Sequence, residues 1–151
     1  MASEPMSGIL FDTSIYIVAL RQGHAAILSL RRASRTGNGS SHPLWLSAVV
    51  LSELFIGASD RKARRQLVQT EKAFTKLHRM LVPIQRDWSV AGQVLARIGE
   101  KYGYEQVGRT RLTNDALIAI TAARHGFTVL TKNATDFEKI AEFWPFCWEA
   151  G

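Results

Sequence analysis

TNDALIAITAARHGFTVLTKNATDF, residues 113–137, is the stretch that decides the fold. It predicts a helix that is capped by Thr113, carries Asp115 in its first turn and ends at Gly126. A short apolar strand is expected to follow over residues 127–130. A carboxylate in the first turn of a helix gains about 0.3–1 kcal/mol from the helix dipole. That gain accounts for Asp115 alone, but it does not explain why acids recur at comparable places along the chain.

Composition bounds the class of protein. With 151 residues, the chain is expected to form one domain, residues 1–151, with a buried core. The single Cys147 cannot form an intramolecular disulfide, so we expect a reducing, cytoplasmic compartment. The start lacks a basic segment followed by an apolar one, and no apolar run approaches the ~18 residues of a membrane span. We therefore expect neither secretion nor membrane insertion.

The charge balance indicates a polyanionic partner. The sequence carries a formal net charge of +6 and has a pI near 9.9. Such a balance is typical of proteins that bind nucleic acid, although charge alone mainly reports solubility and non-specific attraction. Arg109 and Arg111 lie in an expected polar connection, residues 103–112, which leads directly into the helix that carries Asp115.

An aspartate also follows the first expected strand. Residues 8–11 are apolar and predict a short strand, after which Asp12, Thr13 and Ser14 lead into a buried helix that starts near Ile15. An aspartate at such a strand-to-helix turn is often only a helix cap. For Asp12 taken alone, capping and a functional role both remain open.

A third acid lies in an otherwise apolar helix. After a second helix over residues 25–33, residues 44–46 predict a strand, and Ser47 is expected to cap a helix that ends at Gly57. Glu53 is the one charged residue in that helix, and burying an unpaired carboxylate costs several kcal/mol. Glu53 therefore needs a cation, a water-filled cleft or a metal, unless this face of the helix is exposed.

The remaining elements complete an alternating pattern. Residues 60–81 predict a long basic helix whose apolar stripe is either core or a dimer seam. Residues 82–84 predict a strand, and Asp87 is expected to cap the helix that follows. Residues 136–143 predict a short helix, and residues 144–148 a final edge strand. The alternation predicts an α/β fold with a parallel sheet of about five strands, covered on both faces by helices.

In such folds, ligands gather at the carboxyl ends of the strands, near the point where the direction of strand connection reverses. Asp12 follows the first strand, Glu53 lies in the helix after the second, and Asp136 follows the fourth. Asp115 opens the helix before the fourth strand. If the first and fourth strands are neighbours, these four acids converge. Clustered carboxylates are suited to Mg²⁺ or Mn²⁺, held as one ion or as two ions about 4 Å apart.

Several short motifs in this order resemble the PIN-domain nucleases. The likeness is greatest to the VapC-like toxins of bacterial toxin–antitoxin pairs, and the motifs extend over nearly the whole chain. They are residues 12–14, the helix over residues 47–57, residues 114–119 and residues 131–137. The resemblance implies a three-layer α/β/α sandwich, Mg²⁺- or Mn²⁺-dependent endoribonuclease activity, homodimers and inhibition by a small antitoxin.

Within this resemblance, Asp12, Glu53 and Asp115 match the three core acids. Family members vary in the position of the fourth acid, where this sequence offers Asn133 at one place and Asp136 at the other. Asp12 and Asp115 are expected to contact the metal directly, while Glu53 and Asp136 act as ligands or orient water. Supporting hydrogen bonds, with ordinary turn capping as the alternative, are expected from Thr13, Ser14, Thr131 and Asn133.

Two functions therefore remain open. In the first, the protein is a metal-dependent endoribonuclease, and Arg109 and Arg111 guide the RNA backbone in a contact that salt weakens. In the second, it is a non-catalytic PIN-like RNA-binding or regulatory module that keeps the same scaffold. The acids favour the first, because a module that binds a polyanion gains nothing from carboxylates in its cleft.

Overall fold

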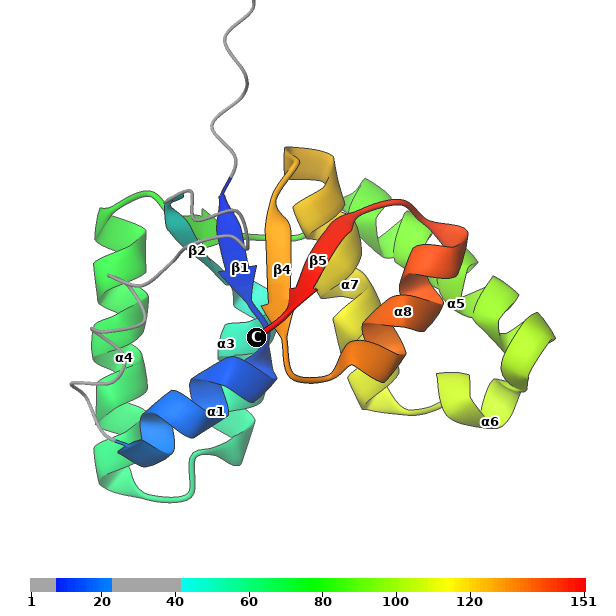
Figure 1. The fold of residues 1–151 in the computed structure, drawn as a ribbon. Coiled ribbons are helices and arrows are strands. Elements are labelled where there is room, and N and C mark those ends of the chain that lie inside the picture. The colour runs from blue at the N-terminus through cyan, green and yellow to red at the C-terminus, as the bar shows by residue number, and fades with distance from the viewer. Residues whose placement is uncertain (1–7, 23–41) are drawn as a thin grey trace, which may run out of the picture.

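The structure, a computed structural model, describes residues 8–22 and 42–151, and the helix expected over residues 25–33 lies outside this part. Its centre is a sheet of five parallel strands in the order β3-β2-β1-β4-β5 (Figure 1). The strands are β1 (Ile9–Phe11), β2 (Leu44–Ser47), β3 (Met80–Leu81), β4 (Thr128–Thr131) and β5 (Cys147–Ala150). The prediction of a parallel, five-stranded α/β fold is confirmed.

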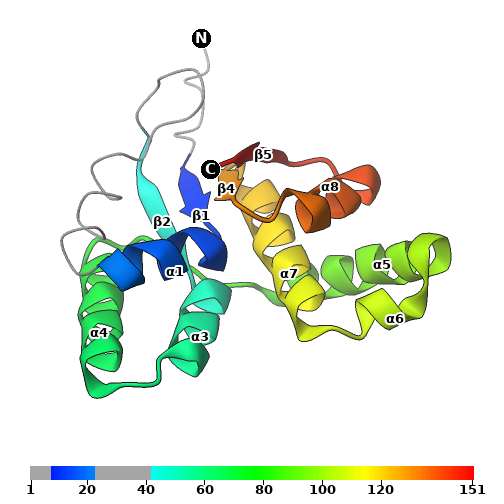
Figure 2. The same ribbon diagram turned by 60° about the horizontal axis from the view of Figure 1, so that its bottom comes forward.

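Helices flank the sheet as two groups (Figures 1 and 2). The first group consists of α1 (Thr13–Gln22), α3 (Ala48–Gly57) and α4 (Arg61–Lys76). The second consists of α5 (Gln85–Tyr102), α6 (Tyr104–Val107), α7 (Thr110–His125) and α8 (Ala134–Phe143). Connections between parallel strands are right-handed as a rule. Strands β2 and β3 are added on one side of β1, and β4 and β5 on the other, so the helices of the two halves lie on opposite faces of the sheet. The result is the expected three-layer sandwich. Among the helices described, none has the length and apolar character needed to cross a membrane.

The reversal takes place beside β1, which pairs in parallel with both β2 and β4. Ile9 is in register with Leu44 on one side and with Thr128 on the other. Ile9 and Leu10 are fully buried, as expected for a central strand covered on both faces. The prediction that the first and fourth strands are neighbours is therefore confirmed, and the turns after β1 and β4 lie side by side.

The helix that carries Asp115 begins one turn earlier than predicted. α7 starts at Thr110 rather than at Thr113, and its cap position, Arg109, makes no side-chain capping bond. The additional turn places Leu112 in the core, where it is 4% exposed. Asp115 consequently lies in the second turn of the helix rather than in the first. The expected polar connection over residues 103–112 also contains the short helix α6.

The third and fifth strands lie at positions different from those expected. The predicted strand at residues 82–84 is instead an extended entry to α5, and β3 lies just before it. Pro83 has no N–H to donate to a sheet, which disfavours a strand there. At the other end, the N–H of Trp144 still bonds to the carbonyl of Ile140 and closes α8. β5 therefore begins at Cys147 and not within the first residues of the range 144–148.

The apolar stripe of α4 belongs to the core. Leu67 and Phe74 are each 1% exposed and pack inside the chain's own hydrophobic cluster. The helix ends at Lys76, because His78 adopts a positive φ of 56° that helical residues do not take, and Leu81 belongs to β3. Of the two roles considered for this stripe, core packing is the one found.

Asp87 is more than the helix cap that we expected. It is 1% exposed, and Ile84 rather than Asp87 occupies the cap position of α5. The Asp87 carboxylate accepts the backbone N–H of Ile84 at 2.9 Å and three bonds from the Arg124 guanidinium at 2.9, 3.1 and 2.9 Å. Arg124 lies near the end of α7, so this buried ion pair fastens α5 to the helix that carries Asp115.

Gly126 ends α7 in the left-handed conformation, with φ 70° and ψ 25°, as the sequence predicted. The change Gly126→Ala is expected to lower the free energy of unfolding by about 1 kcal/mol, because a Cβ disfavours that conformation. Gly92 is the matched control, since it lies on the exposed side of α5 with nothing within 4 Å of an added Cβ. Gly92→Ala should stabilise by about 0.5–1 kcal/mol. Urea unfolding measures both changes, and equal stabilities of the two variants would contradict a special conformational role for Gly126.

Candidate active site

Asp12 lies at the carboxyl end of β1 and is only 3% exposed. Its Oδ1 accepts the backbone N–H of Ser14 at 2.9 Å and also the Ser14 hydroxyl. Its Oδ2 accepts the hydroxyl of Thr131, at the end of the neighbouring strand β4, at 2.5 Å. Asp12 therefore caps α1, as the simpler interpretation of the sequence proposed. It is also held by Thr131 of β4, on the other side of the point where the direction of strand connection reverses.

Glu53 reaches the same place from α3. The side chain is half-buried, and its Oε1 accepts the hydroxyl of Thr13, the first residue of α1, at 2.7 Å. Ser52 and Ile56 on the same helix are exposed, so this part of α3 borders a cavity rather than the core. Of the environments that the sequence left open for Glu53, the structure shows a cleft, and this cleft leaves room for a cation beside Glu53.

Asn133 connects the two remaining acids. Its side-chain amide nitrogen donates to Asp115 Oδ2 at 3.1 Å and to Asp136 Oδ2 at 2.9 Å. Its backbone N–H donates to the hydroxyl of Thr131 at 2.8 Å, and that hydroxyl in turn donates to Asp12. Hydrogen bonds thus run from β1 through the end of β4 to α7 and α8. Asn133 and Asp136, the two candidates for one position, are both present in this network.

Asp115 is buried beside the other three acids. It is 5% exposed, and burial, followed by the negative charges of Asp12, Asp136 and Glu53, raises its pKa to about 8. The positive charge of Arg111 opposes this rise. A buried carboxylate surrounded by other carboxylates is unfavourable unless a proton or a cation compensates the charge.

The oxygen donors fit a hard divalent cation in their chemistry, because Mg²⁺ and Mn²⁺ prefer carboxylate ligands completed by water. In the part of the chain that the structure describes, no three Asp, Glu, His or Cys side chains are already arranged to hold a metal ion. The Asn133 amide lies between two of the acids and bonds to both. A cation bound by the Oδ2 atoms of both acids would therefore have to displace this amide.

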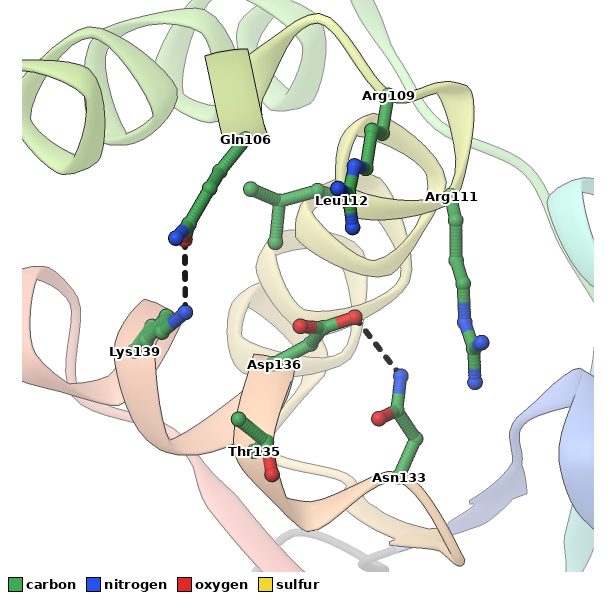
Figure 3. Close-up of a pocket in the computed structure, with 8 residues that line it drawn as sticks. All are labelled: Gln106, Arg109, Arg111, Leu112, Asn133, Thr135, Asp136 and Lys139. Atoms are coloured by element: carbon green, nitrogen blue, oxygen red, sulfur yellow. Dashed lines mark hydrogen bonds between the residues drawn. The ribbon is translucent and has the colours of Figure 1, made fainter. Parts of the chain in front are cut away.

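Two cavities meet at the cluster. The first, about 450 Å³, is lined by Asp12, Glu53 and Asp115 together with apolar residues of α1 and α3. The second, about 300 Å³, is lined by Asn133 and Asp136 together with basic side chains of α7 and α8 (Figure 3). Arg111 borders both cavities, and Arg109, the other expected RNA contact, borders the second. The four acids are neighbours, but Asp136 borders the second cavity, whereas the other three border the first.

Two residues that bond to each other at the second cavity were absent from the predicted site. Lys139 donates to the side-chain oxygen of Gln106 at 2.8 Å, which joins α8 to α6 at the cavity edge. Lys139 follows Asp136 by three residues, and residues three apart share a face of a helix. That spacing was the available sequence pattern for Lys139. Gln106 had none, because α6 was not predicted.

The Thr131 hydroxyl is the central link of the network, which makes Thr131→Val informative. The change removes the donor to Asp12 and the acceptor of the Asn133 N–H in a side chain that is fully buried. We expect about 1–3 kcal/mol lower stability in urea unfolding, because a buried polar group loses its partner. Thr128→Val, on the half-buried start of the same strand, is the matched control and should cost less. Equal losses in the two variants would contradict a special role for Thr131.

The fold and the site together define a class: an α/β protein with an acidic cleft at the switch point of a parallel sheet. The family model of the PIN domain matches residues 9–143. This chain therefore belongs to the PIN domain family, as its motifs suggested.

Individual relatives are consistent with this assignment. The chain is 32% identical over 133 residues to Ribonuclease VapC1 of Rickettsia felis, covering 88% of this chain and 90% of that protein. DNA-bound VapBC from Salmonella typhimurium has a similar fold, with a TM-score of 0.65 and 23% identity, covering 96% of this chain and 98% of that one. VapBC-5 from Mycobacterium tuberculosis, of the VapBC family of toxin–antitoxin systems, gives a TM-score of 0.51 at 22% identity, covering 95% and 97%.

Proposed function

We propose that this protein is a metal-dependent endoribonuclease that hydrolyses phosphodiester bonds in RNA and acts as the toxin of a toxin–antitoxin pair. The observation that carries the proposal is the burial of Asp115 among Asp12, Asp136 and Glu53, which raises its pKa to about 8. Such a cluster is costly in the free protein and becomes favourable when a cation compensates its charge. The substrate class is supported by the 32% identity to Ribonuclease VapC1.

The residues divide into three roles in this proposal. Asp12 and Asp115 would hold Mg²⁺ or Mn²⁺, as one ion or two, while Glu53 and Asp136 complete the ligand set or orient the attacking water. When bound, the cation supplies charge neutralisation on the scissile phosphate and lowers the pKa of water. Thr13, Ser14, Thr131 and Asn133 hold the acids through the bonds described above. Arg109 and Arg111 would guide the RNA backbone beside the acids, and the positive charge of Arg111 also lowers the pKa of Asp115.

The partners are proposed by analogy with relatives. VapBC-5, a similar fold, is described as a member of a family of toxin–antitoxin systems, which supports a cognate antitoxin for this chain. A homodimer and a cytoplasmic location are proposed as well, as in the family resemblance. The homodimer contact would use a surface other than the apolar stripe of α4, because Leu67 and Phe74 of that stripe are buried in the core.

Titration calorimetry with Mn²⁺, paired with an RNA-cleavage assay, tests the proposed function. The wild type is expected to bind Mn²⁺ and to cleave RNA, and chelation should abolish cleavage. Asp12→Asn should bind Mn²⁺ at least roughly 10-fold more weakly and lose cleavage, because it removes a ligand while the amide oxygen can still accept the Ser14 N–H. Circular dichroism confirms that the variant is folded. A folded wild type that neither binds Mn²⁺ nor cleaves RNA would favour the non-catalytic RNA-binding module.

A further inference from the structure

The second cavity differs in charge from the first. Three cationic side chains, Arg109, Arg111 and Lys139, line it against one acid, Asp136. In Figure 3, Arg109 and Arg111 approach from the start of α7, and Lys139 approaches from α8 on the other side. This basic cavity of about 300 Å³ therefore adjoins an acidic one of about 450 Å³, and the two share Arg111.

The charges of the basic cavity are available to a ligand. Lys139 is held by the neutral side-chain oxygen of Gln106 at 2.8 Å, a bond that fixes the ammonium group without neutralising it. Within residues 8–22 and 42–151, Arg109 and Arg111 form no ion pair. The carboxylate of Asp136 accepts from Asn133 rather than from any of the three cations. Three cationic donors around one concavity that holds a single acid form an anion site.

The arrangement, an acidic cavity beside a basic one, suits a nucleic acid strand, in which phosphates repeat at every nucleotide. A phosphate at the acids requires a cation, whereas a neighbouring phosphate in the basic cavity meets arginine and lysine directly. The described residues that line the basic cavity offer no aromatic ring on which a base could stack, which favours a phosphate over a base as its ligand.

We propose that the basic cavity is a phosphate subsite for single-stranded RNA and that it binds the nucleotide next to the one whose phosphodiester is cleaved. The inference rests on the proposed function, and it assigns Lys139 and Gln106 to substrate binding beside Arg109 and Arg111. Single strands are favoured because their backbone can bend into a concave site, which a rigid duplex cannot do. The strand thus extends from the acids toward α6 and α8, rather than over the apolar rim formed by α1 and α3.

Binding is measured by fluorescence anisotropy with a fluorescein-labelled, ten-nucleotide single-stranded RNA, in an Asp115→Asn background that prevents cleavage. Adding Lys139→Gln or Arg109→Gln should weaken binding roughly 3- to 10-fold and reduce the salt dependence of log Kd by about 0.7, the value for one phosphate contact. Lys72→Gln, an exposed lysine on α4 in the other helix group, is the matched control and should change neither quantity.

Cleavage supplies a second, independent measurement. The wild type should show a higher kcat/KM for the ten-nucleotide RNA than for a dinucleotide with a single phosphodiester. Lys139→Gln should lower kcat/KM for the ten-nucleotide RNA roughly 3- to 10-fold by raising KM, and it should leave kcat/KM for the dinucleotide unchanged. The reason is that only the longer substrate reaches the subsite.

The outcomes separate the subsite from the proposed function. Unchanged affinity, salt dependence and length preference in Lys139→Gln and Arg109→Gln would overturn the subsite, while cleavage by the wild type would leave the ribonuclease proposal intact. A polyglutamate peptide that binds the wild type but not Lys139→Gln, with RNA binding unchanged, would assign the cavity to an acidic protein partner and overturn the inference. A wild type that binds RNA through these residues but does not cleave it would reject the ribonuclease, and it would also overturn the assignment of the cavity to a nucleotide beside a scissile bond.

Discussion

Asp115→Asn is expected to unfold at a higher temperature than the wild type at pH 8.5 without metal, although it should lose RNA cleavage. The folded-state pKa of Asp115, about 8, lies above its ordinary value of 3.8. Between these values the folded protein holds a proton that the unfolded chain has lost, so the free energy of unfolding falls as pH rises. Asparagine cannot ionise and avoids this loss. The gain should be absent near pH 4 and largest above pH 8.

The gain should be large for a single substitution. At ~1.4 kcal/mol per pH unit, and allowing for relaxation of the cluster, it is on the order of 3 kcal/mol. That corresponds to a rise of roughly 6–12 °C in Tm for a chain of this size. Calorimetric scans at pH 4.5 and pH 8.5 measure it. Asp60→Asn, at the exposed cap of α4, is the matched control and should bring no comparable gain.

Asp115→Asn should lower the rate of RNA cleavage although it raises the thermal stability. Removing a hydrogen-bond partner of a metal ligand typically lowers metal affinity or activity about 10–100-fold, so removing a ligand itself should lower the cleavage rate roughly 1000-fold or more. Adding Mn²⁺ should raise the Tm of the wild type and narrow its difference from Asp115→Asn, because only the wild type gains from compensation of the Asp115 charge. An Asp115→Asn variant that is less stable than the wild type at pH 8.5, or that cleaves normally, would contradict this account of the cluster.

Arg124→Met is expected to be the most destabilising of the substitutions considered. It removes three hydrogen bonds from the Asp87 carboxylate, whose side chain is 2% exposed. Leaving a buried charge without its partner costs about 3–5 kcal/mol. Urea unfolding at pH 7 measures the loss. Lys101→Met, which breaks the exposed pair between Lys101 and Glu142, is the matched control and should have little effect.

The pH dependence of this loss identifies its cause. Burial by itself raises the pKa of Asp87, but the hydrogen bonds from Arg124 and the Ile84 N–H, with the charges of Arg124 and His125, outweigh burial and lower it. The pair therefore stabilises the fold above the ordinary pKa of 3.8, and this contribution is lost as pH falls through the lowered folded-state pKa. Arg124→Met should approach the wild type in stability as the medium becomes acidic. A difference that is constant with pH would indicate lost packing instead of a lost ion pair.

The sequence was most informative where local chemistry determines the structure. The apolar runs after Gly126 and before Asp12 predicted β4 and β1, because buried parallel strands are continuous apolar segments. One boundary failed where tertiary packing outweighs local preference, since α7 extends back to Thr110 because Leu112 gains burial. Another failed on local chemistry, because Pro83 lacks the N–H of a strand residue although its neighbours are apolar.

For the candidate site, topology brought Asp12, Glu53, Asp115 and Asp136 into one neighbourhood, as their places relative to the strands indicated. The sequence did not predict that the Asn133 amide would bond to two of these acids, because side-chain directions depend on the turn after β4. Nor did it pair Asp87 with Arg124, which is 37 residues away and has no local pattern that marks it as a partner.

The pairing of β1 with β4 also means that the site needs both ends of the chain. The hydroxyl that holds Asp12 comes from Thr131, 119 positions further along the chain. A nascent polypeptide that has not yet emerged from the ribosome as far as β4 contains the first acid without the neighbours that position it. If the chain is the ribonuclease proposed here, each copy must be almost completely synthesised before its own site can form.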